Sequence, residues 1–358
     1  MDMPCAPGFL RLILAALVLV QHYSNCDFGG CDFGGWAVFM FFVLSGYWIS
    51  RMYMGKYRHA HSPWRSFVLN RYFRLLPVYL ACLGVAYVVY ARFALLPDFS
   101  RSPGWWLRAL PIVGSNENGM LIGVFWSLDI EFQFYLIAPF VVVALHRLSA
   151  RNALGVTAAL AVMTVYFCFA GWTDIHRDNV KLVFYFLGFF AGGILIHRLN
   201  YVASRRAALL SLAILAACPA ALTAYPGTRG IFIALVDARL LALNPGISAI
   251  DTFVALPLIS RIVAKRSSAL DLHFGNFSYA LYAFHVVPAT VYYARYGLLH
   301  SSTRHGPLAV ALGAALIGSL LIYLCIDRSF ENLRKRLAGS LPTGRSLSDG
   351  ATPPSGIS

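Results

Sequence analysis

Residues 10–24 read LRLILAALVLVQHYS, an apolar helix with one ionisable side chain near each end. Arg11 precedes the run 12–20, whose side chains carry no polar atom, and His22 follows it. Their eleven-residue spacing lies within about 20° of three full turns and spans about 16 Å of rise, so the two side chains share one helix face. Ionisable groups at bilayer depth usually face a protein interior or a wet cavity. Arg11 and His22 are therefore either interfacial residues at the two helix ends or members of one internal cavity.

The composition predicts an all-α polytopic membrane protein. Hydrophobic residues make up 59% of the 358 residues and charged residues only 12%, whereas a soluble domain carries about 25% charged residues. We expect about ten transmembrane helices in one bundle. They are predicted near residues 9–24, 36–54, 72–91, 122–145, 153–171, 181–197, 207–224, 246–262, 275–294 and 307–327.

The basic residues predict the orientation of this bundle. Nineteen Lys or Arg fall in the loops 51–74, 146–152, 197–206 and 261–271 and in the tail from 328, whereas nine fall in the alternate loops. Because cytoplasmic loops carry the excess of Lys and Arg, we expect both termini in the cytoplasm. The net charge of +14 then reflects membrane topology and does not indicate a nucleic-acid partner.

One membrane domain, residues 1–338, is expected to fill most of the chain. Residues 339–358 are rich in Gly, Ser and Pro, a composition typical of disorder, and we expect a disordered cytoplasmic tail. Cys26 and Cys31 lie in the tandem repeat CDFGGCDFGG. They form a disulfide if that side is oxidising, or they mark a duplication without a chemical role. No metal-ligand spacing is evident.

The third span begins with charged residues in RSFVLNRYFRLLPVYL (65–80). Arg71 and Arg74 stand at i and i+3 and share a helix face at the predicted cytoplasmic end. They are either positive-inside anchors or an anion site. The second role is suited to arginine because each guanidinium offers phosphate a planar fork of donors.

The fourth span begins FWSLDIEFQFYLIAPF (125–140) and contains two carboxylates. Ser127, Glu131 and Tyr135 follow at i, i+4 and i+8 and share a face, and Asp129 and Gln133 form a second polar pair. Carboxylates within an apolar span are costly unless they face an interior. We expect Glu131 to line a cavity, where it pairs with the arginines or orients a histidine.

The ninth span reads FGNFSYALYAFHVVPA (274–289) and carries another polar stripe. Ser278, Tyr282 and His285 stand at i, i+4 and i+7 on one face. His285 either lines the acceptor side of the cavity or is a buried histidine that is hydrogen-bonded for packing.

These segments, taken in order, resemble a known family. They are Arg-x10-His (11–22), FFVLSGY (41–47), RYFRLLPVY (71–79), WSLDIEFQFYL (126–136), FGNFSYALYAFH (274–285) and IDRSFENL (326–333). Together they resemble membrane-bound acyltransferase family 3, the bacterial carbohydrate O-acyltransferases that include O-antigen, exopolysaccharide and nodulation-factor acetylases. The resemblance runs roughly from Phe9 to Leu337, nearly the whole chain.

The resemblance implies a multi-pass protein of the bacterial inner membrane. Such a protein takes an acyl group, commonly acetyl, from cytoplasmic acyl-CoA and delivers it to a sugar hydroxyl. Acyl-CoA is then a donor substrate, and no permanently bound cofactor is expected. His22 would match the essential histidine of the family, and Arg11 its partner arginine. Arg71 and Arg74 would match the paired arginines, and Glu131 the acid after the Trp-Ser-Leu signature.

This chain departs from the family pattern at three positions. Phe39 stands where a polar residue, usually Asp, precedes the Phe-Phe pair, and Phe132 replaces the second acid of a common Glu-Glu pair. The acid of the closing motif is Asp327 in place of the usual Glu. These differences bear on the identity of the acceptor more than on the class of reaction.

Acyl transfer from a thioester to an alcohol needs a base, donors for the oxyanion and cations for the CoA phosphates. We expect His22 to be the base, because imidazole titrates near working pH. Attack is either direct or through an acyl-His22 intermediate. We assign Arg11, Arg71 and Arg74 to the CoA phosphates. All these groups are expected to line one tunnel through the bilayer, with Ser127, Tyr135, Tyr282 and His285 along its wall.

A transporter or flippase for a lipid-linked or small sugar is the alternative function. Such a protein would also carry His, Arg and Glu within its spans. It would more often show an internal repeat of two halves, and none is evident in this sequence.

Overall fold

The structure, a computed structural model, describes residues 5–24, 33–112, 120–173, 181–231, 238–296 and 305–331. These residues form helices and contain no β-strand. The helices are α1 (Pro7–Ser24), α2 (Gly34–Gly55), α3 (Pro63–Arg92), α4 (Pro103–Ala109), α5 (Phe125–Arg147), α6 (Ala150–Phe169), α7 (Leu187–Arg198), α8 (Arg205–Ala224), α9 (Ala238–Leu241), α10 (Asn244–Val254), α11 (Leu256–Val263), α12 (Ala269–Phe284), α13 (Val286–Tyr296) and α14 (His305–Ile322). Cys26, Cys31 and residues 339–358 lie outside the described residues.

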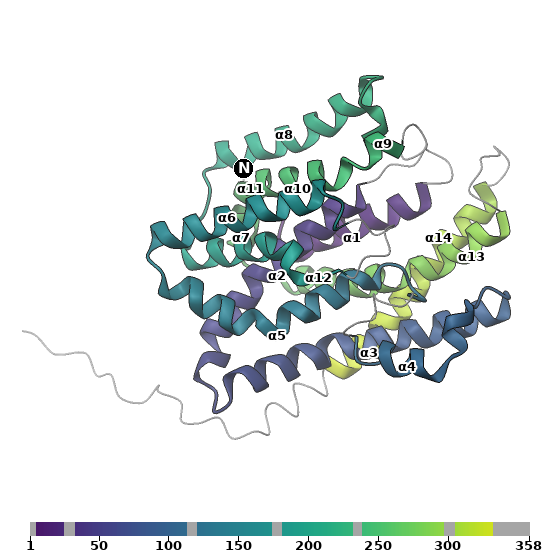
Figure 1. The fold of residues 1–358 in the computed structure, drawn as a ribbon. Helices are drawn as coiled ribbons and strands as arrows, with labels where there is room; N and C mark the ends of the chain where they lie inside the picture. Colours follow the sequence, from purple (N-terminus) through teal and green to yellow (C-terminus); the bar gives the residue numbers. More distant parts are fainter. Residues whose placement is uncertain are drawn as a thin grey trace, which may run out of the picture.

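Helices occupy all ten ranges that hydropathy predicts (Figure 1). Six helical segments of the described residues are long and apolar enough to cross a membrane, and a seventh is gained if α10 and α11, bent by 49°, form one span. The helices α1 and α7 are apolar but shorter. The protein is therefore all-helical with several membrane-spanning helices, whereas the number ten and the cytoplasmic termini stay predictions.

The ninth predicted span is broken into α12 and α13 at His285. Pro288 explains the break, because a proline has no N–H for the carbonyl four residues earlier and its ring crowds that carbonyl. The interruption places His285 at the C-terminal cap of α12, in the interior of the protein, where its side chain is fully buried.

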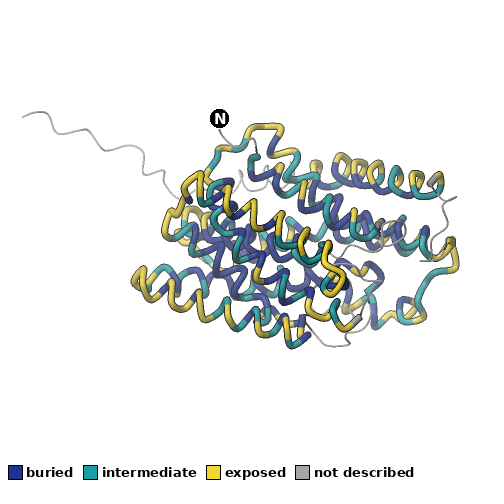
Figure 2. The backbone as a smooth tube through the Cα atoms, turned by 90° about the horizontal axis from the view of Figure 1, so that it is seen from above, coloured by how far each residue is buried: buried dark blue, intermediate teal, exposed yellow. Residues whose placement is uncertain are grey.

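The outward faces of the bundle are apolar. Figure 2 shows buried residues toward the interior of the bundle and exposed residues on the outer sides of the helices. On α8 and α14 the exposed residues include Leu210, Leu212, Val310 and Ile317. A soluble protein rarely exposes such continuous apolar surface, and a lipid-facing surface accounts for it.

Helix α1 lies against α12 with its first turn in backbone contact. A Cβ at Gly8 would overlap the main-chain carbonyl of Asp271, and a Cβ at Gly275 would lie 3.3 Å from the Gly8 Cα. Small residues allow helices in membranes to approach this closely. The Asp271 carboxylate, which is only 4% exposed, accepts hydrogen bonds from the Gly8 N–H at 3.0 Å and the Phe9 N–H at 2.8 Å. An acid of α12 thereby caps the otherwise unpaired amides of α1.

A second close contact joins α2 to α7. A Cβ at Gly46 would overlap the carbonyl of Phe190, and a Cβ at Gly193 would overlap the carbonyl of Val43. Stacked rings continue this interface into α5, where Phe134 lies 3.9 Å from Phe190 between centroids. These contacts hold α5, which carries Glu131, against α2.

We predict that Asp271→Asn destabilises the protein by about 1–3 kcal/mol, because an amide has one acceptor oxygen and leaves one buried N–H of α1 unpaired. The measurement is the thermal unfolding midpoint of the protein in detergent. Asp98→Asn is the matched control, since the Asp98 side chain is 98% exposed and its ion pair with Arg101 is long at 3.8 Å. Equal midpoints for the two variants would contradict the capping role.

Candidate active site

An inner pocket of about 140 Å³ lies between α1, α2, α3, α5 and α12. Apolar side chains, such as Phe41, Phe42 and Leu128, form part of its wall. Polar side chains from all five helices converge on the rest. They are Arg11, Ser45, Arg71, Arg74, Ser127, Glu131, Tyr135, Ser278, Tyr279 and Tyr282.

An outer pocket of about 230 Å³ adjoins the inner pocket. The two pockets share Arg11, Arg71, Trp48, Met52 and Gly275 in their walls. The outer pocket also reaches Ser267, which belongs to the loop 261–271 that the basic residues assign to the cytoplasm. A ligand entering from this end of the bundle would therefore meet the two arginines first.

Arg11 and Arg71 face this pocket without a carboxylate partner in ion-pair contact among the described residues. Arg71 donates from Nη2 to the Met52 sulfur at 3.1 Å, and its buried Nε has no hydrogen-bond partner in the described part of the chain. A thioether is a weak acceptor. The two guanidiniums, one from α1 and one from α3, are thus placed to receive an anion.

Arg74 is held differently from its neighbour. Its guanidinium forms an ion pair with Asp327, whose side chain is 4% exposed, and donates to Asn276 Oδ1 at 3.0 Å. It also lies over the Tyr279 ring, 5.9 Å from the centroid. The sequence predicts Arg74 as a phosphate ligand, but these contacts first make it a brace that joins α3 to α12 and to the helical turn after α14.

Glu131 accepts hydrogen bonds from Ser45 Oγ at 2.9 Å and from the Tyr135 hydroxyl at 2.6 Å. Ser45, a polar residue in the otherwise apolar motif FFVLSGY (41–47), therefore belongs to the pocket. The contacts of Glu131 join α2 to α5 within the pocket that holds the arginines. His22 is not among the residues lining that pocket, so the expectation that Glu131 orients its imidazole gains no support from this geometry.

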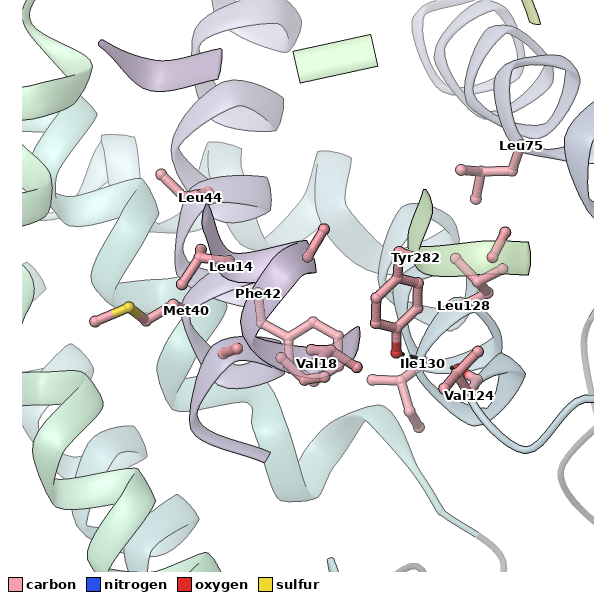
Figure 3. Packing of buried hydrophobic residues seen from close by; sticks show 14 of the residues in the cluster. Leu14, Val18, Met40, Phe42, Leu44, Leu75, Val124, Leu128, Ile130 and Tyr282 are labelled. Atoms are coloured by element: carbon pink, nitrogen blue, oxygen red, sulfur yellow. Dashed lines mark hydrogen bonds between the residues drawn. The ribbon is translucent and has the colours of Figure 1, made fainter. Parts of the chain in front are cut away.

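Ser127 and Tyr282 are joined to each other across α5 and α12. Their hydroxyl oxygens are 2.7 Å apart and lie 3.0 Å (Ser127) and 3.2 Å (Tyr282) from the Val124 carbonyl oxygen. Because each hydroxyl has one hydrogen, one of them donates to the other, and that second hydroxyl donates to the carbonyl. Figure 3 shows the Tyr282 hydroxyl turned toward Val124 at the start of α5. A shared carbonyl and a shared hydroxyl hydrogen bond fix both side chains in the pocket wall.

His22 and His285 line neither the inner nor the outer pocket. The His285 ring lies beside the Tyr282 ring, with centroids 6.1 Å apart, and the His22 ring lies beside His285 at 5.2 Å. Neither of these two pockets joins the arginines to the histidines, and the single tunnel expected from the sequence stays a prediction. Tyr282 lines the inner pocket, and the His285 ring beside it is in turn the neighbour of His22.

Four further side chains that the sequence analysis singles out, those of Asp129, Gln133, Phe39 and Phe132, line neither pocket. Gln133 donates to Asp129 Oδ1 at 3.0 Å and to the Lys181 carbonyl at 3.2 Å, so this polar pair ties α5 to the segment before α7. Phe39 stacks on Phe189 with centroids 4.6 Å apart, and Phe132 lies 5.1 Å from Tyr72. The two phenylalanines that depart from the family pattern therefore have packing roles.

Comparison with known proteins places this arrangement in a family. A family model described as an acyltransferase domain, that of the acyltransferase 3 family, matches residues 7–324. The chain is 30% identical over 163 residues to a protein of Bacillus subtilis (strain 168) named putative peptidoglycan O-acetyltransferase YrhL. The match covers 42% of this chain and 25% of that protein. It is also 31% identical over 139 residues to the Caenorhabditis elegans protein named regulator of hypoxia-inducible factor 1. That match covers 35% of this chain and 27% of that protein.

The chain thus spans about a quarter of the length of each of these curated relatives. No solved structure shows a significant match. The family match extends from the first turn of α1 to the turn after α14 and so includes every helix that contributes to the pocket. On this evidence the chain belongs to the acyltransferase 3 family, and its long apolar helices are those of a multi-pass membrane protein.

Proposed function

We propose that the protein transfers an acyl group, acetyl in the simplest case, from cytoplasmic acyl-CoA to a hydroxyl of a cell-surface or secreted carbohydrate. The bacterial inner membrane is the proposed location. The observation that supports this best is the pair Arg11 and Arg71, which face one pocket from two helices without a carboxylate in ion-pair contact in the described structure. An unpaired cation within an apolar bundle is costly, and an anionic substrate would neutralise it.

The CoA phosphates provide that anion. A guanidinium binds phosphate oxygens through two parallel N–H donors, and Arg71 has only the weakly accepting Met52 sulfur to give up for them. Arg74, paired with Asp327, positions α3 and leaves Arg11 and Arg71 as the primary ligands. Glu131 offsets part of the positive charge when the pocket is empty.

The acyl end of the donor would lie toward Ser127 and Tyr282. Their hydroxyls are the polar groups at the inner end of the pocket, and they are fixed by the Val124 carbonyl. One of these O–H groups would turn from the Val124 carbonyl to the oxyanion that forms when a thioester is attacked, and would stabilise it. The apolar side chains Phe41, Phe42 and Leu128 would exclude water from the thioester.

The acceptor hydroxyl loses its proton during the attack, and His22 is the proposed base. His22 lies beside His285, whose ring adjoins Tyr282 in the pocket wall, so the donor would approach along the arginine pocket and the acceptor from the His22 side, and the two would meet near Tyr282. The relative named as a peptidoglycan O-acetyltransferase supports a carbohydrate acceptor. Family membership favours acyl transfer over the alternative of a transporter or flippase.

We expect membranes that contain the protein to transfer label from acetyl-CoA to a glycan extract, and His22→Ala to lower the rate. A general base contributes about 10²- to 10⁴-fold, so the loss should be at least about 100-fold. His59→Ala is the control, because His59 is exposed in a short helix (Tyr57–His59) away from the site. Full transfer by His22→Ala would rule out the base, and an unlabelled glycan with the wild-type protein would favour a transporter.

For the donor site we predict that Arg71→Lys raises the KM for acyl-CoA about 10-fold with an unchanged thermal midpoint. Lysine keeps the charge but loses the fork of donors, and a tenfold change is about 1.4 kcal/mol. Initial rates at varied acyl-CoA concentration measure this. Arg101→Lys, at an arginine whose side chain is 67% exposed, should leave the KM unchanged. A wild-type KM for Arg71→Lys would remove the phosphate assignment.

A further inference from the structure

His285 occupies an unusual place for a histidine in an apolar bundle. Its side chain is completely buried at the break between α12 and α13. It lies next to Tyr282 on one side and His22 on the other. Neither the pocket nor the helix break requires an imidazole here, since an apolar side chain could fill the same space.

The tautomer of this imidazole is fixed by the fold. Nδ1 of His285 lies 2.9 Å from the Leu281 carbonyl oxygen. A carbonyl only accepts hydrogen bonds, so Nδ1 carries the hydrogen. In the neutral ring Nε2 then holds a lone pair and is an acceptor.

That acceptor is left without a partner. Nε2 of His285 is buried and makes no hydrogen bond within the described part of the chain. A buried polar atom without a hydrogen bond costs about 1–3 kcal/mol, so a donor is expected nearby. His22 is the ring beside it, at a centroid distance of 5.2 Å and an interplanar angle of 45°. The two rings make no hydrogen bond in the structure, but a rotation of the His22 side chain would turn one of its ring nitrogens toward Nε2.

Tyr23 holds the two rings together. Its hydroxyl donates to the His285 carbonyl at 3.0 Å and lies 3.2 Å from the Ala311 carbonyl. The last turn of α1 is thereby fastened to the break between α12 and α13 and to α14. The neighbouring residue His22 is carried by that same turn, so its position against His285 is set by the fold.

We propose that His285 is the positioning residue for His22, with Nε2 of His285 accepting a hydrogen bond from one ring nitrogen of His22. This inference rests on the proposed function. The bond directs the N–H of neutral His22 toward His285 and leaves the other ring nitrogen, with its lone pair, for the acceptor hydroxyl. The arrangement follows the logic of a nucleophile, a base and a third group that orients the base, with an imidazole as the third group.

The proton balance of the reaction is complete with these groups. The acceptor O–H bond breaks and its proton passes to His22, while the hydroxyl oxygen forms a bond to the thioester carbonyl carbon. The C–S bond then breaks, and the CoA thiolate takes the proton from His22 to leave as a thiol. His285 stays neutral throughout and stabilises the imidazolium of His22 through the same N–H···N bond.

The test compares His285→Phe, which keeps an aromatic ring without an acceptor, with His285→Gln, which keeps an acceptor oxygen. For His285→Phe we expect kcat to fall about 100-fold, within the range for loss of a base's orientation, with the KM for acyl-CoA unchanged. The acid limb of the kcat–pH profile should move to lower pH, because the imidazolium of His22 loses its acceptor. His285→Gln should recover part of kcat and of the profile.

Tyr23→Phe is a milder variant that guards against misfolding of His285→Phe. It removes only the hydroxyl that fastens the two rings, and we expect a kcat loss of about 10-fold with an unchanged KM for acyl-CoA. The titratable side chains against His285 in the described structure are His22, Tyr23 and Tyr282. His273→Phe, on the exposed side of α12, is the control and should match the wild type.

A folded His285→Phe protein with wild-type kcat and an unshifted profile would overturn the positioning role. So would wild-type kcat for Tyr23→Phe if His285→Phe fails to fold. Both results presuppose label transfer by the wild-type protein. Its absence would instead overturn the proposed function, and the inference with it.

Discussion

The contact between α1 and α12 is the constraint on which the rest of the site depends. The Asp271 carboxylate caps the first amides of α1, and Gly8 and Gly275 allow the two backbones to touch. With that end fixed, Arg11 is placed in the pocket one turn later. At the other end, Tyr23 bonds to the carbonyl of His285. One helix–helix contact thus aligns the arginine pocket at one end with the histidine pair at the other.

The charges in the bundle are divided between structure and function. Arg74 and Asp327 neutralise each other, and a buried ion pair of this kind is costly to break once formed. Arg11 and Arg71 lack such a partner within the described ranges. Their positive charge is retained beside Glu131 at the wall of a pocket that opens outward. Arg71 and Arg74 stand three residues apart in α3, and this division explains how one can face the pocket while the other forms a structural ion pair.

Much of the fold could be predicted from the sequence, because long apolar runs and basic loops reflect burial in lipid. Helical periodicity also correctly grouped Ser127, Glu131 and Tyr135 on one face, since neighbours at i and i+4 are fixed by local geometry. Periodicity shows which residues share one face of a helix, but it does not show which other helix packs against that face. The sequence therefore could not indicate that Glu131 bonds to Ser45 or that Arg74 pairs with Asp327.

Two other features depend on tertiary structure alone. Asp271 stands near the start of α12, where an acid is ordinarily a local cap, and only folding brings the first turn of α1 to it. Arg11 and His22 both belong to α1, yet Arg11 lines the inner pocket whereas His22 packs against His285. The position of a residue along a helix can be counted from sequence, whereas the side chains that surround it belong to other helices.

The proposal that the acyl donor binds in the arginine pocket, while the acceptor approaches from the His22 side of Tyr282, is central to this account. A cryo-electron microscopy structure with a non-hydrolysable acetyl-CoA analogue would test it most directly. The account predicts phosphate density on the guanidiniums of Arg11 and Arg71 and the acetyl end against Ser127 and Tyr282. Phosphate density on the His22 side of Tyr282, or outside both pockets, would contradict it.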